Sequence, residues 1–361
     1  MAIERIEMKD FLVFRGEFAL DFCPGVNVII GGNATGKTTL IKALYRLCNY
    51  DKYDNTADYF FSIDRYFDYP FEHLKMKAIK DNNYTQICIK SLQQNGFDGT
   101  SSVFFNGKWV LYDSSEYLND YSNVHSAIYG DLQTEVKFIT ENFSKIPSIF
   151  VPANNIISQS KGIIELFNEY ELDFDVTQID IISNLSRPMT KILKSNCQKV
   201  TKKLGDLIDG EVLIEGDRFF IKKKSGLKIE FNLEASGFVR LGVLWKLLRN
   251  GLLEDGSVLF WDELENSLNP ELMSDLADIL LELSRGGVQI FLATHNEILA
   301  NYFDINRQKG DKVMFASLYK NGDGIKANTS DRFDFIEPNK LTEESVKQYE
   351  KEIEKRLNNE D

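Results

Sequence analysis

The chain has 361 residues, of which 43% are hydrophobic and 12% aromatic, so it can bury a core and is not a disordered chain. Its 42 basic and 55 acidic side chains give a net charge of −13, which argues against a whole surface built to coat nucleic acid. The four cysteines lie far apart without a C-x-x-C pair, so neither a zinc site nor a disulfide framework is indicated. The sequence has no signal-peptide core and no run of about 18 apolar residues, so we expect a cytoplasmic protein without a membrane partner.

The first 50 residues predict two outer strands and then a strand, a glycine loop and a helix. Residues 3–8 and 17–22 alternate in polarity, whereas residues 26–30 form a continuous apolar run typical of a buried strand. Two glycines end that run, and residues 38–47 space their apolar side chains as a helix does. We expect a mixed α/β core that combines residues 1–50 with residues 230–336, where strands and helices alternate again.

The middle of the chain predicts two further units. Residues 51–147 are expected to form an inserted β-rich lobe, because short strand patterns alternate there with Asn, Gly and Asp turns. Residues 148–229 are expected to form a strand, a helical lobe and a hairpin. Within them the helical patterns cover 161–170 and 177–207, the second broken near Pro188, and the hairpin pattern runs from 212 to 231.

The last segment, residues 337–361, carries a highly charged helical pattern over 341–357. Its composition favours a solvated cap or a partner-docking element over a core helix. The chain has no internal repeat and no long heptad run, so we expect no long coiled coil.

The strongest motif is residues 31–38, GGNATGKT, which satisfies G-x-x-x-x-G-K-[ST] between a predicted strand and a predicted helix. Glycines let successive backbone N–H groups turn inward around an anion, and the helix N-terminus adds partial positive charge. Lys37 is expected to reach the β- and γ-phosphates of a nucleotide, and Thr38 to offer its hydroxyl to Mg²⁺. The candidate nucleotide-binding residues are Gly31, Asn33, Ala34, Thr35, Gly36, Lys37, Thr38 and Thr39.

A second motif supplies the acidic groups that such a loop needs. Residues 258–261 form an apolar run typical of a buried strand, and Asp262 and Glu263 follow it directly. We assign Asp262, together with Thr38, to the Mg²⁺ shell. Glu263 lies one residue further on and is therefore aimed differently, so it is the candidate to polarise the attacking water.

The order of these elements resembles the ABC-type ATPase heads, and among them the RecF/SMC-like and OLD-like group. Residues 265–270, ENSLNP, look like the D-loop of these ATPases, and His295 after the apolar residues 291–293 is similar to their switch histidine. Residues 234–238, EASGF, occupy the place of the signature motif, although they depart from its usual L-S-G-G. Residues 9–15, KDFLVFR, resemble the opening segment of the group, which makes Arg15 a further nucleotide-site candidate.

The resemblance implies a P-loop NTPase of the ABC-ATPase type that takes ATP and Mg²⁺ and hydrolyses ATP, with Glu263 and His295 as catalytic residues. It also implies a divided site, because Ser236 and Gly237 begin a helix that faces the nucleotide of a second subunit in this family. ATP would then close a head-to-tail homodimer or a higher homo-oligomer. Small ATPases of this group commonly act with a separate effector such as a nuclease, which suggests a role in phage defence or DNA repair.

Two alternatives stay open at this point. The protein could be a nucleotide-gated scaffold with negligible turnover, since the presence of Glu263 does not set a rate. DNA is a possible partner, because a lysine-rich helix at 191–203 and a lysine-rich hairpin at 222–228 could contact phosphates. An ordinary solvated helix face accounts for the same lysines slightly better.

Overall fold

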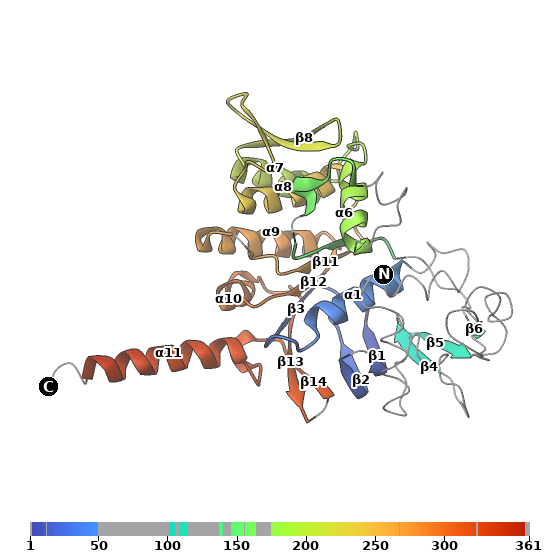
Figure 1. The fold of residues 1–361 in the computed structure, drawn as a ribbon, viewed down its shortest axis with the longest axis vertical. Helices are drawn as coiled ribbons and strands as arrows, with labels where there is room; N and C mark the ends of the chain where they lie inside the picture. The colour runs from blue at the N-terminus through green and yellow to red at the C-terminus, as the bar shows by residue number, and fades with distance from the viewer. Residues whose placement is uncertain are drawn as a thin grey trace.

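The computed structural model describes residues 2–11, 13–49, 101–105, 108–113, 137–139, 146–154, 156–163, 175–266, 268–322 and 324–357. Most of the predicted β-rich lobe at 51–147, and most of the predicted helix at 161–170, lie outside these residues. The described residues form a central sheet that is covered on both faces (Figure 1).

The central sheet has six strands in the order β14-β13-β3-β12-β11-β7. Neighbouring strands are parallel except for β13 and β14, which form an antiparallel hairpin, so the sheet is mixed as predicted. Residues far apart in the sequence are thereby joined, since β3 lies between β12 and β13. The strands are β3 (Val26–Gly31), β7 (Ser148–Val151), β11 (Val258–Asp262), β12 (Gln289–Ala293), β13 (Val313–Asn321) and β14 (Gly324–Ser330).

Side chains of the central strands alternate between two hydrophobic clusters. In β11, Phe260 packs in the cluster on the side of α1 (Lys37–Cys48), whereas Leu259 and Trp261 pack in the cluster on the opposite face. This is the period of two that a pleated strand imposes, and it explains why the buried strands read as continuous apolar runs. The sheet is therefore fixed from both sides, and its carboxyl ends are held rigidly.

A second, antiparallel sheet covers α1 and has the order β2-β1-β4-β5-β6. Its first two strands are those predicted at the N-terminus, and Ile6 of β1 is paired with Phe105 of β4. The backbone strands described between residues 101 and 139 thus extend the N-terminal hairpin. The strands are β1 (Arg5–Phe11), β2 (Phe14–Asp21), β4 (Ser101–Phe105), β5 (Lys108–Asp113) and β6 (Lys137–Ile139).

The opposite face of the central sheet carries helices and a small sheet (Figure 1). Residues 177–207 form two helices separated at Pro188, as predicted. The predicted hairpin at 212–231 is instead a three-stranded antiparallel sheet, because residues 228–230 pair with β9. These elements are η3 (Ile156–Gln159), α6 (Val176–Ser186), α7 (Ser195–Leu207), β8 (Gly210–Glu215), β9 (Arg218–Lys223), β10 (Lys228–Glu230) and α8 (Ser236–Arg249).

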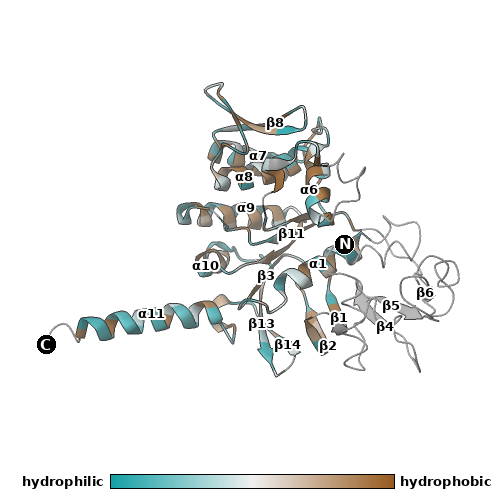
Figure 2. Ribbon diagram, in the orientation of Figure 1, coloured by the Kyte–Doolittle hydropathy of each residue, from teal (hydrophilic) through white to brown (hydrophobic). Residues whose placement is uncertain are grey.

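The remaining helices follow the strands of the core. Asn296 caps α10 by accepting a hydrogen bond from the Leu299 N–H at 2.9 Å, and this helix was missed by the sequence analysis. No helix among the described residues is long and apolar enough to cross a bilayer. The helices are η4 (Pro270–Leu272), α9 (Met273–Arg285), α10 (Glu297–Asn306), η5 (Phe333–Phe335) and α11 (Lys340–Leu357). Figure 2 shows that α11 is predominantly hydrophilic and extends away from the rest of the protein.

Candidate ATP-binding and hydrolysis site

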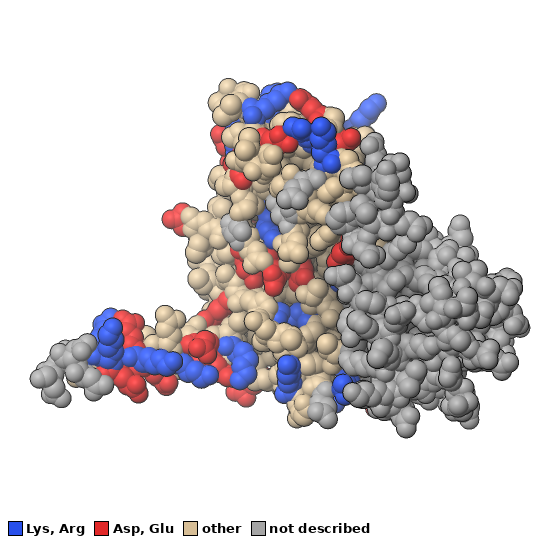
Figure 3. Space-filling view, viewed as in Figure 1, with Lys and Arg blue, Asp and Glu red and all other residues tan. Residues whose placement is uncertain are grey.

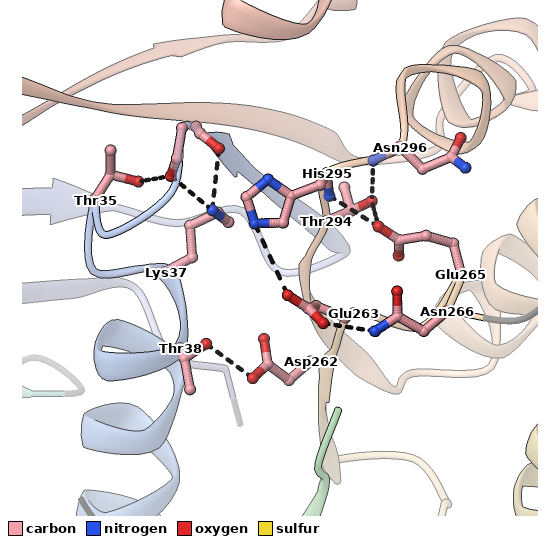
Figure 4. Close-up of polar contacts among 12 residues, drawn as sticks. Thr35, Lys37, Thr38, Asp262, Glu263, Glu265, Asn266, Thr294, His295 and Asn296 are labelled. Carbon is pink, nitrogen blue, oxygen red and sulfur yellow. Dashed lines mark hydrogen bonds and ion pairs between the residues drawn. The ribbon is translucent and has the colours of Figure 1, made fainter. Parts of the chain in front are cut away.

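The candidate site lies at the carboxyl edge of the central sheet. Strands β3, β12 and β11 are neighbours and run parallel, so their carboxyl ends meet at one edge. The glycine loop follows β3, Asp262 ends β11, and His295 follows β12. Open α/β sheets bind ligands at this edge. The glycine loop is thereby brought together with two motifs that lie more than 200 residues further along the sequence (Figure 4).

The glycine loop adopts a conformation that requires its sequence. Gly36, the residue before α1, has φ +85°, and a Cβ at this position would lie 2.8 Å from Val13 Cγ2 and from Phe14 Cζ. Ala34 also has a left-handed backbone, with φ +56°. Glycine is thus needed at Gly36 both for its backbone angle and for the close approach of the N-terminal hairpin. The loop ends at the N-terminus of α1, where the backbone N–H groups of the first turn are available to an anion.

Lys37 lies folded onto the loop. Its Nζ donates to the carbonyl oxygens of Gly31 and Gly32, both at 3.0 Å. Burial lowers the pKa of Lys37 to about 8, against the opposing effect of the nearby carboxylates, of which Asp262 acts most strongly. A buried ammonium held only by carbonyl oxygens gains from an anion placed beside it. The loop therefore holds a cation at the position where phosphates would bind.

Thr38 and Asp262 are hydrogen-bonded to each other, so the two side chains predicted to bind Mg²⁺ lie side by side. The Thr38 hydroxyl donates to Asp262 Oδ2 at 2.8 Å, and Asp262 is only 5% exposed. Its other oxygen, Oδ1, is buried without a hydrogen-bond partner among the described residues, and burial raises the pKa of this carboxyl to about 6. A hard divalent cation would give the Oδ1 atom a partner and would lower the pKa of the carboxyl again. Mg²⁺ suits this position because it prefers carboxylate and hydroxyl oxygens and retains part of its water shell. These residues fit Mg²⁺.

Glu263 is held in an unusual backbone conformation. Its φ is +47°, a left-handed value that is rare for a residue other than glycine, and its N–H donates to the Ala293 carbonyl at 2.9 Å. The side chain accepts a hydrogen bond from Asn266 Nδ2 at 2.6 Å. Local strain of this kind persists where the surrounding structure enforces it. Here it turns Glu263 away from the direction of Asp262 and toward His295 (Figure 4).

His295 faces Glu263 across the site. Its Nε2 lies 3.9 Å from Glu263 Oε1, which is too long for a hydrogen bond. Burial lowers the pKa of His295, and the charge of Lys37 acts in the same direction. This lowering favours the neutral ring, in which one nitrogen can donate a hydrogen bond and the other can accept one.

Glu265 is a residue whose role the sequence analysis missed. Its Oε1 accepts hydrogen bonds from the Thr294 hydroxyl at 2.5 Å and from the His295 backbone N–H at 2.8 Å (Figure 4). The Thr294 hydroxyl in turn accepts from the Asn296 N–H at 2.9 Å. A buried carboxylate after β11 thus fixes the segment after β12 that carries the histidine. In the sequence, the only sign of this role was that Glu265 begins the D-loop-like segment. The contact with His295 spans 30 residues and depends on the fold.

Arg240 is a second residue that was missed. It lies on α8, is 7% exposed, and donates to the carbonyl of Ala153 just beyond β7. Burial lowers its pKa, and the charges of Glu265, Glu263 and Asp262 oppose that effect. A charged residue within an otherwise buried helix was the available signal. Arg240 links α8 electrostatically to the acidic end of β11.

The structure separates the remaining candidates from this cluster. Arg15 is exposed near the start of β2, and its neighbours Val13 and Phe14 are those that approach Gly36. Ser236 is exposed and Gly237 buried in the first turn of α8, whose main contacts are with α6, α7 and β8. Figure 1 draws α8 on the far side of α9 from α1. Ser236 and Gly237 therefore do not join the phosphate-loop cluster of their own chain.

The lysine-rich hairpin is neutralised within the chain, and the lysine-rich helix is neutralised in part. Lys203 pairs with Asp275 at 2.9 Å, and Lys194 pairs with Glu254 at 3.2 Å. The hairpin lysines 222, 223, 224 and 228 each contact a carboxylate as well. Figure 3 shows blue and red atoms side by side at the top of the molecule. This arrangement favours a solvated, ion-paired surface over an uncompensated cationic strip.

The glycine loop, the paired Thr38 and Asp262, and the strand order define a P-loop NTPase with the fold of an ABC-type ATPase head. Residues 110–301 match the family described as "AAA domain, putative AbiEii toxin, Type IV TA system". The chain belongs to this family. The resemblance to the RecF/SMC group of ABC-type heads is confirmed.

Individual relatives are more distant. A stretch of 47 residues is 49% identical to the DNA replication and repair protein RecF of Lactobacillus gasseri, but it spans 13% of this chain and 12% of that protein. The SMC head domain from Thermotoga maritima is similar in structure, with a TM-score of 0.46 and 14% identity over 91% of this chain and 99% of that one. A second SMC head, bound to the C-terminal winged-helix domain of ScpA, gives a TM-score of 0.48 with 12% identity over 91% and 98% of the two chains.

Proposed function

We propose that this protein is a Mg²⁺-dependent ATPase whose ATP-bound form closes a head-to-tail homodimer. The observation that carries the proposal is the meeting of a phosphate-binding loop, a buried carboxylate and a Glu–His pair at one sheet edge. Each group has the chemistry that phosphoryl transfer needs: a cation, a metal-ligating oxygen and an acceptor for the proton of water.

Binding of ATP begins at the glycine loop. The backbone N–H groups before α1 receive the phosphate oxygens, and Lys37 Nζ leaves the carbonyls of Gly31 and Gly32 for the β- and γ-phosphates. Thr38 and Asp262 would hold the Mg²⁺ that neutralises the phosphate charge. Thr39 and Asn33 flank these groups and complete the proposed nucleotide-binding loop, and Arg15 follows Val13 and Phe14, which approach Gly36 from the N-terminal hairpin.

Hydrolysis is assigned to the side chains of Glu263 and His295. A water molecule beside this pair can donate a hydrogen bond to the Glu263 carboxylate, which orients its oxygen toward the γ-phosphate. The neutral His295 ring donates a hydrogen bond to the γ-phosphate as charge builds on its oxygens. Glu265 and Asn266 keep both side chains in place by the hydrogen bonds described above.

Dimerisation completes the site from outside. The first turn of α8 carries N–H groups that no helix can satisfy internally, and the exposed Ser236 lies at that end. The γ-phosphate bound by a second copy is an anion of the right kind for such a helix end. Binding of ATP would then close the pair, and hydrolysis would remove the contact and reopen it.

The biological setting is proposed from the comparisons. The family description names a toxin–antitoxin system, and such a system has two components, which supports control of a separate effector such as a nuclease in phage defence. The name of the RecF relative supports DNA repair instead. We place the protein in the cytoplasm, where ATP is abundant.

A scaffold with negligible turnover is the second candidate function, and it differs from the first only in the rate of phosphate release.

The test follows the mass of the protein in solution together with phosphate release. With Mg²⁺ and ATP, Glu263→Gln is expected to run as a dimer by size-exclusion chromatography with light scattering, because closure outlasts slow hydrolysis. Ser236→Arg is expected to bind ATP and stay monomeric, whereas the exposed control Ser225→Arg is expected to behave as the parent protein. A monomeric Glu263→Gln with nucleotide bound would refute the dimer. Wild-type phosphate release no faster than that of Glu263→Gln would favour the scaffold.

A further inference from the structure

A cavity of about 620 Å³ lies where α7, α8 and the hairpin of β8 and β9 meet. These elements lie together at the top of the molecule in Figure 1, and none of the residues that line the cavity belongs to the candidate ATP site. Sites that bind small molecules have volumes of this order. The cavity is therefore large enough for a ligand of its own.

Two cations in the cavity wall have no carboxylate partner. The wall carries four lysines and Arg249 but only two acids, Asp206 and Glu211. Three of the lysines are paired, namely Lys222 with Glu211 at 3.6 Å, Lys223 with Glu234 at 2.6 Å and Lys224 with Asp206 at 2.7 Å. Lys202 of α7 and Arg249 of α8 form no ion pair with any residue that the structure describes. Asp206 attracts Lys202 from a distance, but its carboxylate is already held by Lys224, so the wall keeps an excess of positive charge.

The same end of α8 holds a buried cation. Lys246 lies three residues before Arg249, is 3% exposed, and likewise forms no ion pair among the described residues. Burial lowers the pKa of Lys246, and the positive charge of Arg249 lowers it further. The two like charges therefore repel, and an anion bound beside Arg249 would relieve that repulsion.

Trp245 forms an aromatic part of the cavity wall. Its side chain is 6% exposed, and Arg249 Cζ lies 5.9 Å from its ring centroid, within the range of a cation–π contact. Trp245 Nε1 donates a hydrogen bond to no described residue. A Cβ on Gly205, near the end of α7, would lie 3.5 Å from this Nε1 and 3.3 Å from the Gly210 carbonyl oxygen. Glycine weakens a helix, but here it allows close packing and leaves the indole N–H uncovered.

We infer that this cavity binds a phosphorylated small molecule of about the size of a nucleoside monophosphate. A phosphate monoester carries close to two negative charges and three acceptor oxygens, which match the two unpaired cations and the indole N–H. The apolar surface of Leu193 and Trp245 contacts the uncharged part of the ligand. This inference does not depend on the proposed ATPase activity.

A nucleic acid strand fits the same surface less well. Its phosphates are spaced along a chain, and binding them takes several unpaired cations in a row. In the cavity wall the hairpin lysines are already paired with carboxylates. A strand that crossed the wall would meet only Lys202 and Arg249 unpaired, whereas a small molecule inside the cavity reaches both.

The experiment observes Trp245 itself. The full chain with Lys37→Ala, in which Lys37 no longer serves the proposed ATP site, is labelled with 5-fluorotryptophan at its three tryptophans and studied by ¹⁹F NMR. The Trp245 signal is assigned from its loss in Trp245→Phe. We expect AMP to shift this signal with a dissociation constant of about 1 mM or lower, inorganic phosphate to shift it more weakly, and adenosine to leave it unchanged.

Two results of this titration would contradict the inference. A Trp245 signal that neither AMP, GMP, CMP, UMP nor inorganic phosphate shifts would overturn the site. Binding of inorganic phosphate as tight as that of every nucleotide would identify free phosphate as the ligand and overturn the assigned ligand size.

Paired variants then test the two cations. Lys202→Gln and Arg249→Gln, in the same background, are each expected to weaken AMP binding about 10-fold, since each removes one charge-assisted hydrogen bond. Lys199→Gln is the matched control, because Lys199 is exposed on the same helix and does not line the cavity. Equal effects of Lys202→Gln and Lys199→Gln, or unchanged affinity in both cavity variants, would overturn the site. Because every sample lacks Lys37, the result is independent of whether the protein hydrolyses ATP.

Discussion

The two parts of the proposed ATP site differ in how far one chain completes them. At the sheet edge, Lys37 is already hydrogen-bonded to the glycine loop and Thr38 to Asp262, at 3.0 Å or less. At the start of α8, Ser236 is exposed, and its helix packs mainly on α6, α7 and β8.

In the proposed function this difference gives the two parts separate tasks. The groups already in place at the sheet edge would bind nucleotide with little further ordering of side chains, which would favour affinity. The exposed helix end would gain its partner only on assembly, which would make that contact conditional on ATP. Changes at the sheet edge should therefore impair binding or chemistry in each copy, whereas changes at α8 should impair assembly alone.

The largest effect is expected at Lys37. Lys37→Ala removes the only side-chain cation that we assign to the β- and γ-phosphates, and we expect kcat/KM for ATP to fall by about 10³-fold with loss of measurable binding. Titration of a fluorescent ATP analogue and steady-state phosphate release measure the two quantities. The exposed Lys309→Ala is the control. ATP affinity within about threefold of the parent protein would remove Lys37 from the site.

The next effect is expected at Glu263. Glu263→Gln keeps the size of the side chain and its contact with Asn266 but removes the charge that orients water, so kcat is expected to fall about 10²-fold with affinity retained. Single-turnover hydrolysis measures this step directly. Glu211→Gln, at an exposed position of β8, is the matched control. An unchanged single-turnover rate would show that another group performs this role.

A smaller effect is expected at Glu265. Glu265→Ala leaves the buried Thr294 hydroxyl and the His295 N–H without their acceptor, which is expected to lower the free energy of unfolding by about 1–3 kcal/mol. Because His295 then loses its fixed position, kcat is expected to fall about 10-fold, while KM for ATP stays the same. Thr294→Ser keeps the hydroxyl and serves as control. Loss of stability without any change in kcat would limit Glu265 to a structural role.

The sheet edge was predictable because its determinants are local in sequence. Gly36 and Lys37 lie between a buried strand and a helix, and Asp262 follows a second buried strand, so pattern and topology together place them at one edge. The long stretch of sequence between Lys37 and Asp262 does not matter, because neighbouring parallel strands bring their carboxyl ends together.

Other features could not be predicted from local patterns. The hydrogen bonds from Glu265 to Thr294 and His295 depend on the loop after β11 meeting the loop after β12, which only the folded sheet decides. The third strand of the small sheet, Lys228–Glu230, is too short to show a period of its own and is held by pairing with β9. The ion pairs of the lysine-rich helix likewise involve acids on other elements.

The claim that one site is shared by two copies is tested most directly by mixing two inactive variants. Lys37→Ala lacks the phosphate-binding part, and Ser236→Arg lacks the closing part, so each alone is expected to release little phosphate. In an equal mixture, mixed pairs would contain one complete site, and we predict recovery of roughly a quarter of the wild-type rate. A mixture no more active than the sum of its components, under conditions in which the wild-type protein turns over, would contradict a shared site.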